Sequence, residues 1–276
     1  MNTTYLTGDL KAVRIMSGAV GLLMIIVTVA GLLYPSTIYP TRNLLSTFHL
    51  NDFANLVFGL PLLHFSMILA GRGRLTGLLC WVSALVYVLY TYIPFMIAMP
   101  FGILFLPYTL LVVLSAYALI DLVAKIDGEA VRRSFTERAP SKSSAVLLLA
   151  FALMIPLREA LLIVQALLSH SSVDLITAAV WIDDVVVASP LLLIAGVRLW
   201  SRKEMGFVLG PGMLLAYGVL SLGLILMLLL QPRYTGNPVS VGDVVVLAVM
   251  ALVCLIPFAL LLANTTKPGG DEQPES

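Results

Sequence analysis

The chain has 276 residues, of which 60% are hydrophobic and 11% are charged, and its formal net charge at pH 7 is +1. A soluble protein keeps about 25% of its residues charged because its surface faces water, so this composition excludes an ordinary soluble domain. A net charge this close to zero also gives no electrostatic basis for binding nucleic acid.

Eight apolar segments follow one another along the chain, each close to the roughly 20 residues that a helix needs to cross a bilayer. The segments are apolar on all sides, whereas a membrane-spanning strand alternates apolar and polar residues. The predicted spans are 14–33, 53–70, 75–93, 101–123, 145–168, 174–199, 207–230 and 242–263. The sequence therefore predicts an all-α, polytopic transmembrane helix bundle of about eight spans.

An even number of spans places both ends of the chain on one side of the membrane. Thirteen of the 16 Lys and Arg residues fall on that side, Arg42 and Arg233 fall on the other, and Arg158 lies inside a span. Loops rich in Lys and Arg stay in the cytoplasm. We therefore expect a protein of the cell membrane with both termini cytoplasmic.

The first span has an alternative interpretation as a cleaved signal peptide. Lys11 and Arg14 precede it, and Thr28-Val29-Ala30 loosely resembles a cleavage site. Its apolar stretch is longer than the roughly 7–15 residues usual for a signal peptide. This length favours a retained transmembrane helix.

The charged segment between the fourth and fifth spans divides the chain into two halves of four spans. The predicted units are a first half (1–123), a cytoplasmic connector (124–144), a second half (145–264) and a disordered cytoplasmic tail (265–276). A shift of 129 residues aligns a few positions of the halves, which predicts two parallel four-helix repeats. These positions are Pro61-Leu62-Leu63 with Pro190-Leu191-Leu192, Arg74 with Lys203, and Gly77 with Gly206.

Arg158, Glu159, Asp183 and Asp184 lie deep inside the fifth and sixth spans, where an ionisable residue costs at least about 2.5–3.5 kcal/mol. At about 1.5 Å per residue, Arg158 lies some 20 Å along its span, and Asp184 some 15 Å along the antiparallel neighbour. The two depths coincide, so we predict an ion pair between Arg158 and either Asp183 or Asp184. Since adjacent helical residues point about 100° apart, Glu159 is expected to face elsewhere.

Further polar side chains fall in the same half of the predicted bundle, opposite the termini. They predict an outward-facing polar site near the midplane, although an aromatic belt at the membrane surface would also explain the tyrosines, Tyr90 and Tyr92 above all. The candidate substrate-binding or coupling residues are Arg158, Glu159, Asp183, Asp184, Asp52, Asn55, His64, Tyr87, Tyr108 and Tyr217.

Several chemistries can be set aside on the sequence. The chain holds three histidines and two isolated cysteines, Cys80 and Cys254. It has no His-Glu-x-x-His, Cys-x-x-Cys, Gly-x-Ser-x-Gly or Walker motif. We expect no metal and no cofactor, and the expected partners are the lipid bilayer and a small-molecule or lipid ligand. Nothing in the sequence fixes the number of copies.

Three functions are compatible with these residues. A transporter or permease-like carrier could bind an anionic group at Arg158 and a coupling proton at a carboxylate. A membrane enzyme could use two carboxylates as acid and base on a lipid or isoprenoid. A non-catalytic partner or sensor subunit would use its polar groups structurally and bind a soluble partner through segment 124–144.

Part of the first half also resembles known sequences. Segment 92–120 contains Tyr92-Ile93-Pro94 and Leu104-Phe105-Leu106-Pro107-Tyr108, and it follows Leu60-Pro61-Leu62-Leu63 and Gly71-Arg72-Gly73-Arg74-Leu75. With these segments the chain resembles uncharacterised prokaryotic multi-span membrane proteins. The resemblance implies a membrane bundle and no particular activity.

Overall fold

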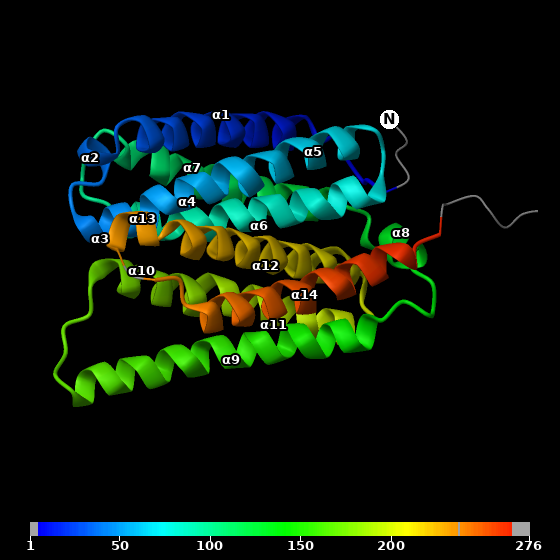
Figure 1. Ribbon diagram of the computed structural model, residues 1–276. Helices are drawn as coiled ribbons and strands as arrows, with labels where there is room; N and C mark the ends of the chain where they lie inside the picture. Colours follow the sequence, from blue (N-terminus) through cyan, green and yellow to red (C-terminus); the bar gives the residue numbers. More distant parts are fainter. Residues whose placement is uncertain (1–4, 237, 267–276) are drawn as a thin grey trace, which may run out of the picture.

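The computed structural model describes residues 5–236 and 238–266, and it is 83% helical with no strand among them. Eight helices in the described part are long and apolar enough to cross a membrane. The predicted all-α bundle of eight spans is therefore confirmed, and the chain is a multi-pass membrane protein. Figure 1 shows the long helices side by side along one common direction.

Five spans are single α-helices and three are composite. The single ones are α1 (Lys11–Leu33), α6 (Leu75–Ala98), α7 (Phe105–Lys125), α9 (Ser141–Leu168) and α14 (Val241–Ala263). The second span joins α3 (Arg42–Leu44), a π-helical turn η1 (Leu45–His49), α4 (Leu50–Ala54), a second π-helical turn η2 (Asn55–Gly59) and α5 (Leu60–Gly71). The sixth joins α10 (Leu175–Asp183), η3 (Asp184–Ala188) and α11 (Ser189–Trp200), and the seventh joins α12 (Glu204–Leu230) and α13 (Pro232–Thr235).

The second span begins at Arg42, eleven residues before the predicted start at residue 53. Its first two turns carry polar residues that are typical of a loop, among them Ser46, Thr47 and His49. Thr41 caps this helix by accepting a hydrogen bond from the backbone N–H of Leu44. Phe48, only 1% exposed, then anchors it against Phe95, with ring centroids 4.3 Å apart. Tertiary packing therefore outweighs the polar composition.

Helices α6 and α12 form the centre of the bundle and pack against each other. Within the most apolar stretch of α6, 89% of the residues are buried, as expected for a helix that is apolar on all sides. Close approach requires small residues on α12: a Cβ at Gly212 would lie 2.8 Å from Cγ1 of Val82 on α6. Small residues are the usual means by which membrane helices approach closely.

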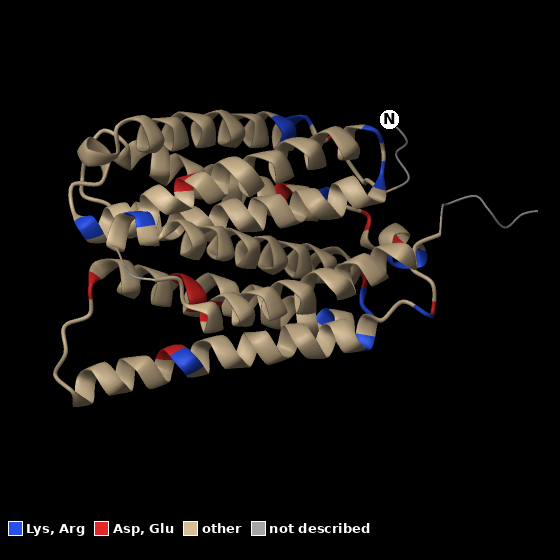
Figure 2. Cartoon of the chain, in the orientation of Figure 1, with Lys and Arg blue, Asp and Glu red and all other residues tan. Residues whose placement is uncertain are grey.

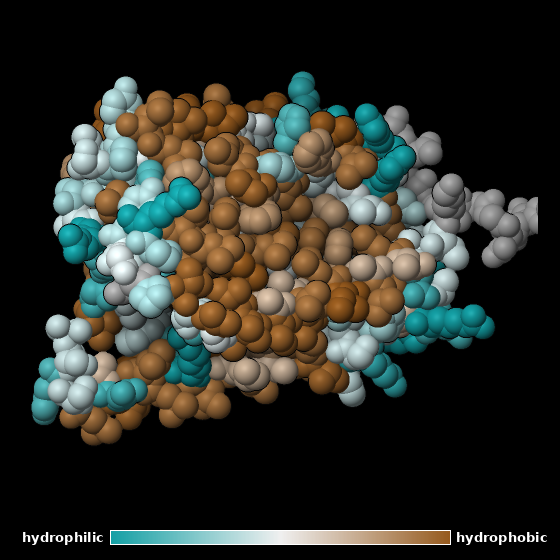
Figure 3. All heavy atoms as spheres, viewed as in Figure 1, coloured by the Kyte–Doolittle hydropathy of each residue, from teal (hydrophilic) through white to brown (hydrophobic). Residues whose placement is uncertain are grey.

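The remaining long helices surround this pair, α1, α5 and α7 on one side and α9, α11 and α14 on the other (Figure 1). Their outward faces carry exposed Leu, Ile and Val side chains. Figure 3 shows a continuous hydrophobic band between hydrophilic ends. An apolar belt of this extent is typical of a surface that faces lipid.

The element bounds of the two halves coincide at the shift of 129 residues. It maps η2 (55–59) onto η3 (184–188), α5 (60–71) onto α11 (189–200), and the start of α6 onto the start of α12. Contacts between the halves are also reciprocal, because α4 packs on α12 while α10 packs on α6. Reciprocal contacts are what a two-fold relation produces. We propose on this basis that the halves are duplicated four-span units.

A proline follows each of the two coinciding π-helical turns. Pro61 and Pro190 lack the backbone N–H that an α-helix would bond to the fourth residue before them. Just before each proline, the N–H of Leu60 bonds to the carbonyl of Asn55, and that of Ser189 to the carbonyl of Asp184, five residues earlier. Such π-bulges are frequent at functional sites.

The connector packs against both described ends of the chain and carries helix α8 (Gly128–Arg133). The N–H of Asp127 donates to the carbonyl of Tyr5 at 2.9 Å, and the N–H of Thr266 donates to that of Ser134 at 2.8 Å. Figure 2 shows most Lys and Arg positions at this end. We call this end proximal and the opposite end distal. The predicted disorder of the tail from residue 267 onward lies outside the described residues.

Candidate functional site

Three carboxylates from the fifth and sixth spans are buried in the distal half of the bundle. Glu159 of α9 and Asp183 of α10 are 0% exposed, and Asp184, the first residue of η3, is 6% exposed. We call these three residues the carboxylate cluster. Asp184 Oδ1 accepts a hydrogen bond from the hydroxyl of Tyr90 on α6, at 2.9 Å.

The predicted ion pair of Arg158 with Asp183 or Asp184 is wrong. Arg158 Nη1 instead lies 2.5 Å from Oε1 of Glu159, and no ion pair joins Arg158 to either aspartate among the residues described. The 100° step between neighbours holds, but it turns Glu159 inward and Arg158 outward, with 69% of the arginine side chain exposed. The long arginine side chain then bends back to the carboxylate beside it.

Four polar atoms around the cluster have no hydrogen-bond partner in the part of the chain that the structure describes. They are both carboxylate oxygens of Asp183, Oε2 of Glu159 and the hydroxyl of Tyr217 on α12. More than about nine in ten buried polar groups in proteins are paired. Asp183 stands out, because a fully buried carboxylate has neither oxygen bonded.

Aromatic rings border the cluster on the side of α6, α9 and α12. The ring centroid of Tyr217 lies 6.2 Å from that of Tyr90 and 6.3 Å from that of Phe151, with which it stacks. The hydroxyl of Tyr217 also interacts electrostatically with Asp183 and Asp184. Tyr90 is therefore a hydrogen-bond donor to the carboxylate cluster, and its interpretation as part of a surface belt is wrong.

The polar residues of the first half form a second, separate group around η2. Asp52 Oδ2 accepts a hydrogen bond from the hydroxyl of Tyr39 at 2.5 Å. Asn55 accepts one from Tyr87 at 3.1 Å, and its amide donates to the hydroxyl of Tyr92 at 3.3 Å. Tyr92, expected at the surface, is 0% exposed. We call this group, with Tyr108 described next, the first-half cluster.

Tyr108 joins the first-half cluster and His64 joins neither group. The ring of Tyr108 stacks on Tyr92 at 6.2 Å, although its hydroxyl has no hydrogen-bond partner. His64 lies on the exposed surface of α5, next to Phe65. The position of His64 in the span predicts its depth in the membrane, but helix packing decides which face of the helix it lies on.

Two buried polar residues of the first half, Tyr39 and His49, were not predicted from the sequence. Tyr39 lies in the loop after the short helix α2 (Pro35–Ile38), where no periodic pattern marks it as buried. His49 bonds through Nδ1 to the carbonyl of Gly31 at 3.1 Å and through Nε2 to the hydroxyl of Tyr234 at 3.0 Å. The predicted single polar site is thus two groups. The first-half cluster is largely hydrogen-bonded, whereas four polar atoms around the carboxylate cluster have no partner among the described residues.

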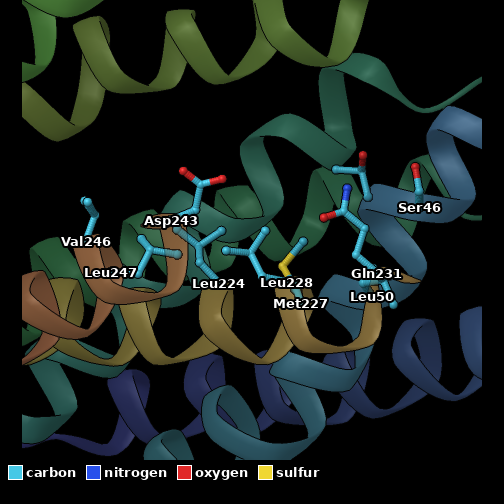
Figure 4. A pocket seen from close by; sticks show the side chains of 10 residues that line it. Ser46, Leu50, Leu224, Met227, Leu228, Gln231, Asp243, Val246 and Leu247 are labelled. Atoms are coloured by element: carbon cyan, nitrogen blue, oxygen red, sulfur yellow. The ribbon is translucent and has the colours of Figure 1, made fainter. Parts of the chain in front are cut away.

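A groove of about 400 Å³ opens at the distal end between the second span, α12 and α14 (Figure 4). Its polar lining is Ser46, Thr47, Gln231 and Asp243, and its apolar lining is Leu50, Leu224, Met227, Leu228, Val246 and Leu247. Leu224 follows Tyr217 by seven residues, or two turns, so both lie on one face of α12, about 10 Å apart along the axis. No residue of the carboxylate cluster lines the groove, and α12 is the element that the groove shares with Tyr217.

The fifth span is loosely held beyond the cluster. No side chain of α9 after Glu159 is buried, and Figure 1 shows its distal end diverging from α10. The proximal half of α9 packs closely on α11, where a Cβ at Gly196 would lie 2.9 Å from Cγ of Leu149. The cluster thus lies where a packed helix pair separates.

Among the described residues, no three His, Cys, Asp or Glu side chains are grouped so that they could hold a metal ion. No family model, no curated protein and no solved structure matches the chain.

Proposed function

We propose that the protein is a proton-coupled carrier of the cell membrane, with both termini cytoplasmic and its site at the carboxylate cluster. The observation that carries this proposal is Asp183, which is fully buried with neither carboxylate oxygen hydrogen-bonded. The proposal adds a proton-binding role to the polar site that the sequence predicts near the midplane.

The charges of the cluster do not balance. Arg158 is paired with Glu159, and Asp184 has a hydroxyl donor in Tyr90, so each of these two carboxylates has a partner. Asp183 has none, and an isolated ionised carboxylate is very costly in a low-dielectric interior. Asp183 must therefore either carry a proton or face a bound cation. A group that exchanges one for the other couples proton movement to solute movement.

The two halves differ in a way that suits alternating access. The hydrogen bonds of Asp52 and Asn55 in the first-half cluster join the loop at Tyr39, the second span and α6. In the second half the distal end of α9 diverges from α10 (Figure 1), and Asp183 has no hydrogen-bond partner among the described residues. Movement of one repeat against the other around a midplane site is how many carriers expose that site to each side in turn.

The direction of opening follows from the distribution of basic residues. The proximal end carries most of the Lys and Arg residues, which supports a cytoplasmic location for this end. The groove opens at the distal end and would receive solute from the outside.

Proteoliposomes with a trapped pH indicator test the proposal. Inorganic cations, amines, carboxylates and sugars would be added outside in turn, and internal pH followed. We expect at least one of these solute classes to drive proton movement in the wild type, and Asp183→Asn to abolish it. Asp174→Asn is the matched control, because Asp174 is exposed and asparagine caps the start of α10 equally well.

Solute-dependent proton movement of equal size in Asp183→Asn and wild type would remove the cluster from the mechanism. Its absence for every solute class, in vesicles that contain folded protein, would remove the carrier itself.

A further inference from the structure

We infer that the carboxylate cluster binds an amphipathic primary amine in its ammonium form, entering through the distal groove. The inference rests on the proposed carrier function and names its substrate class. It starts from the atoms that the cluster leaves without partners.

The atoms of the cluster that have no hydrogen-bond partner need donors. Both oxygens of Asp183 and Oε2 of Glu159 are acceptors, and only the hydroxyl of Tyr217 can also donate. A primary ammonium presents three N–H donors from a single positive charge, as the lysine side chain does. It could therefore donate to both oxygens of Asp183 and to the hydroxyl of Tyr217, which interacts electrostatically with Asp183.

An anionic substrate fits these contacts poorly. The one guanidinium near the cluster, Arg158, points outward and is already bonded to Glu159. An anion would also bring no N–H donor to Oε2 of Glu159, an acceptor that the cluster leaves without a partner. The sequence-based expectation that Arg158 binds an anionic group therefore loses its geometric support.

The rings around the cluster suit the cation as well. The ring centroid of Tyr217 lies 6.2 Å from that of Tyr90 and 6.3 Å from that of Phe151. A cation over the face of an aromatic ring is attracted by the negative potential of the ring, and the attraction grows when water is excluded. Carboxylate oxygens and aromatic faces together form the usual environment of an ammonium group.

The groove has matching character for the rest of such a molecule. Its apolar lining, with Leu224, Leu228 and Val246 among others, would hold an alkyl chain. Asp243 adds a negative charge to the groove lining, whereas Arg42 and Arg233, the basic residues of this end, do not line it. The groove therefore favours an amphipathic cation over an anion or a small inorganic ion.

Binding of the ammonium would release a proton. When the site is empty Asp183 holds a proton, and when the ammonium binds, that proton leaves and the carboxylate pairs with the new cation. One positive charge replaces another, so the exchange is neutral. The ionisable groups around Asp183 are Glu159 and Arg158 of α9, Asp184 of η3, Tyr90 of α6, Tyr217 of α12 and Cys254 of α14.

Calorimetric titration of the full-length protein in detergent with n-hexylammonium tests the inference. Hexyltrimethylammonium keeps the charge and chain but has no N–H donor, and hexanoate reverses the charge. We expect hexylammonium to bind with release of about one proton, measured from the dependence of the heat on the buffer. Hexyltrimethylammonium should bind at least about tenfold more weakly, because it makes no charge-assisted hydrogen bonds.

Two variants locate the binding. Asp183→Asn should weaken hexylammonium binding at least about tenfold and abolish the proton release, whereas Asp174→Asn should change neither. Tyr217→Phe removes a single hydroxyl, so it gives a second reading if Asp183→Asn does not fold. It should weaken binding by about threefold or more. Unchanged affinity in Tyr217→Phe and in any folded Asp183→Asn would overturn the inference.

The outcomes separate the two proposals. Tighter binding of hexanoate than of hexylammonium, or transport of other solutes without amine binding, would overturn the amine site and leave the carrier. Amine binding that depends on Asp183 without any exchange in proteoliposomes would support the site and remove the carrier.

Discussion

Asp52 and Asp183 lie in the distal segments of the second and sixth spans, and both are fully buried, yet their surroundings differ. Tyr39 donates its hydroxyl to Oδ2 of Asp52 and leaves Oδ1 without a partner, whereas among the described residues neither oxygen of Asp183 accepts a hydrogen bond. A buried carboxylate that is hydrogen-bonded can be purely structural. One without partners is where a proton or a ligand must act. On this difference we propose a structural role for the first-half cluster and a functional one for the carboxylate cluster.

Gly31 of α1 tests the structural role of the first-half cluster. A Cβ at this position would collide with Oδ2 of Asp52 and the hydroxyl of Tyr39. We expect Gly31→Ala to break the Tyr39–Asp52 hydrogen bond and lower the free energy of unfolding by about 1–3 kcal/mol, measured by thermal unfolding in detergent. Gly18→Ala in the same helix is the control, because nothing lies within 4 Å of the added Cβ.

The control should be neutral or stabilising by up to about 1 kcal/mol, since alanine favours helix over glycine. Equal unfolding temperatures for the two variants would contradict the tight packing of α1 against Asp52.

At the scale of the element, the π-helical turns decide where Asn55 and Asp184 point. Each turn contains one residue more than an α-helical turn, so it changes the rotation of everything before it relative to everything after it. The prolines that follow, Pro61 and Pro190, are visible in the sequence and suggest kinks. The extra residue is visible only in the backbone, because a proline can also be accommodated by a bend.

Replacement of Pro190 tests whether η3 positions the carboxylates. Pro190→Ala restores an N–H donor, so the turn can return to α-helical geometry and rotate Asp183 and Asp184 by about 100°. We expect the variant to stay helical by circular dichroism but to lose solute-dependent proton movement by at least about tenfold. Pro257→Ala in α14, where no π-turn is present, should keep it.

Proton movement at wild-type level in folded Pro190→Ala would show that the π-turn does not orient the site.

For the whole molecule, the central pair α6 and α12 carries elements of both halves in reciprocal contact. The connector is part of this assembly, because α8 and its neighbours pair with the backbone at Tyr5 and Thr266. The ring of Phe135 in the connector packs against that of Phe207 on α12, with ring centroids 5.0 Å apart. The connector is therefore a packed element of the proximal end and more than a solvated link.

The proposed orientation can be measured with a membrane-impermeant thiol reagent. Ser171, in the loop after α9, and Arg138, in the connector, are both exposed. We expect Ser171→Cys to react in intact cells and Arg138→Cys only after the cells are opened. Both native cysteines are in the membrane spans, Cys254 buried and Cys80 partly so, so the unmodified chain is the blank. The reverse labelling pattern would invert the topology.

The sequence by itself determined the eight spans, because each must bury about 20 apolar residues in lipid whatever its neighbours are. It also determined that Glu159, Asp183 and Asp184 lie deep in their spans, because depth follows from the rise per residue. Asp52 was expected just before the second span, and only the structure, in which this span begins at Arg42, places it inside the helix. Which of them meet was decided only by the tertiary structure. Side-chain direction depends on the rotation of each helix, and rotation is set by packing, by the π-turns and by close contacts such as that at Gly212. For this reason Arg158 pairs with its neighbour Glu159, and Asp183 has no hydrogen-bond partner among the described residues.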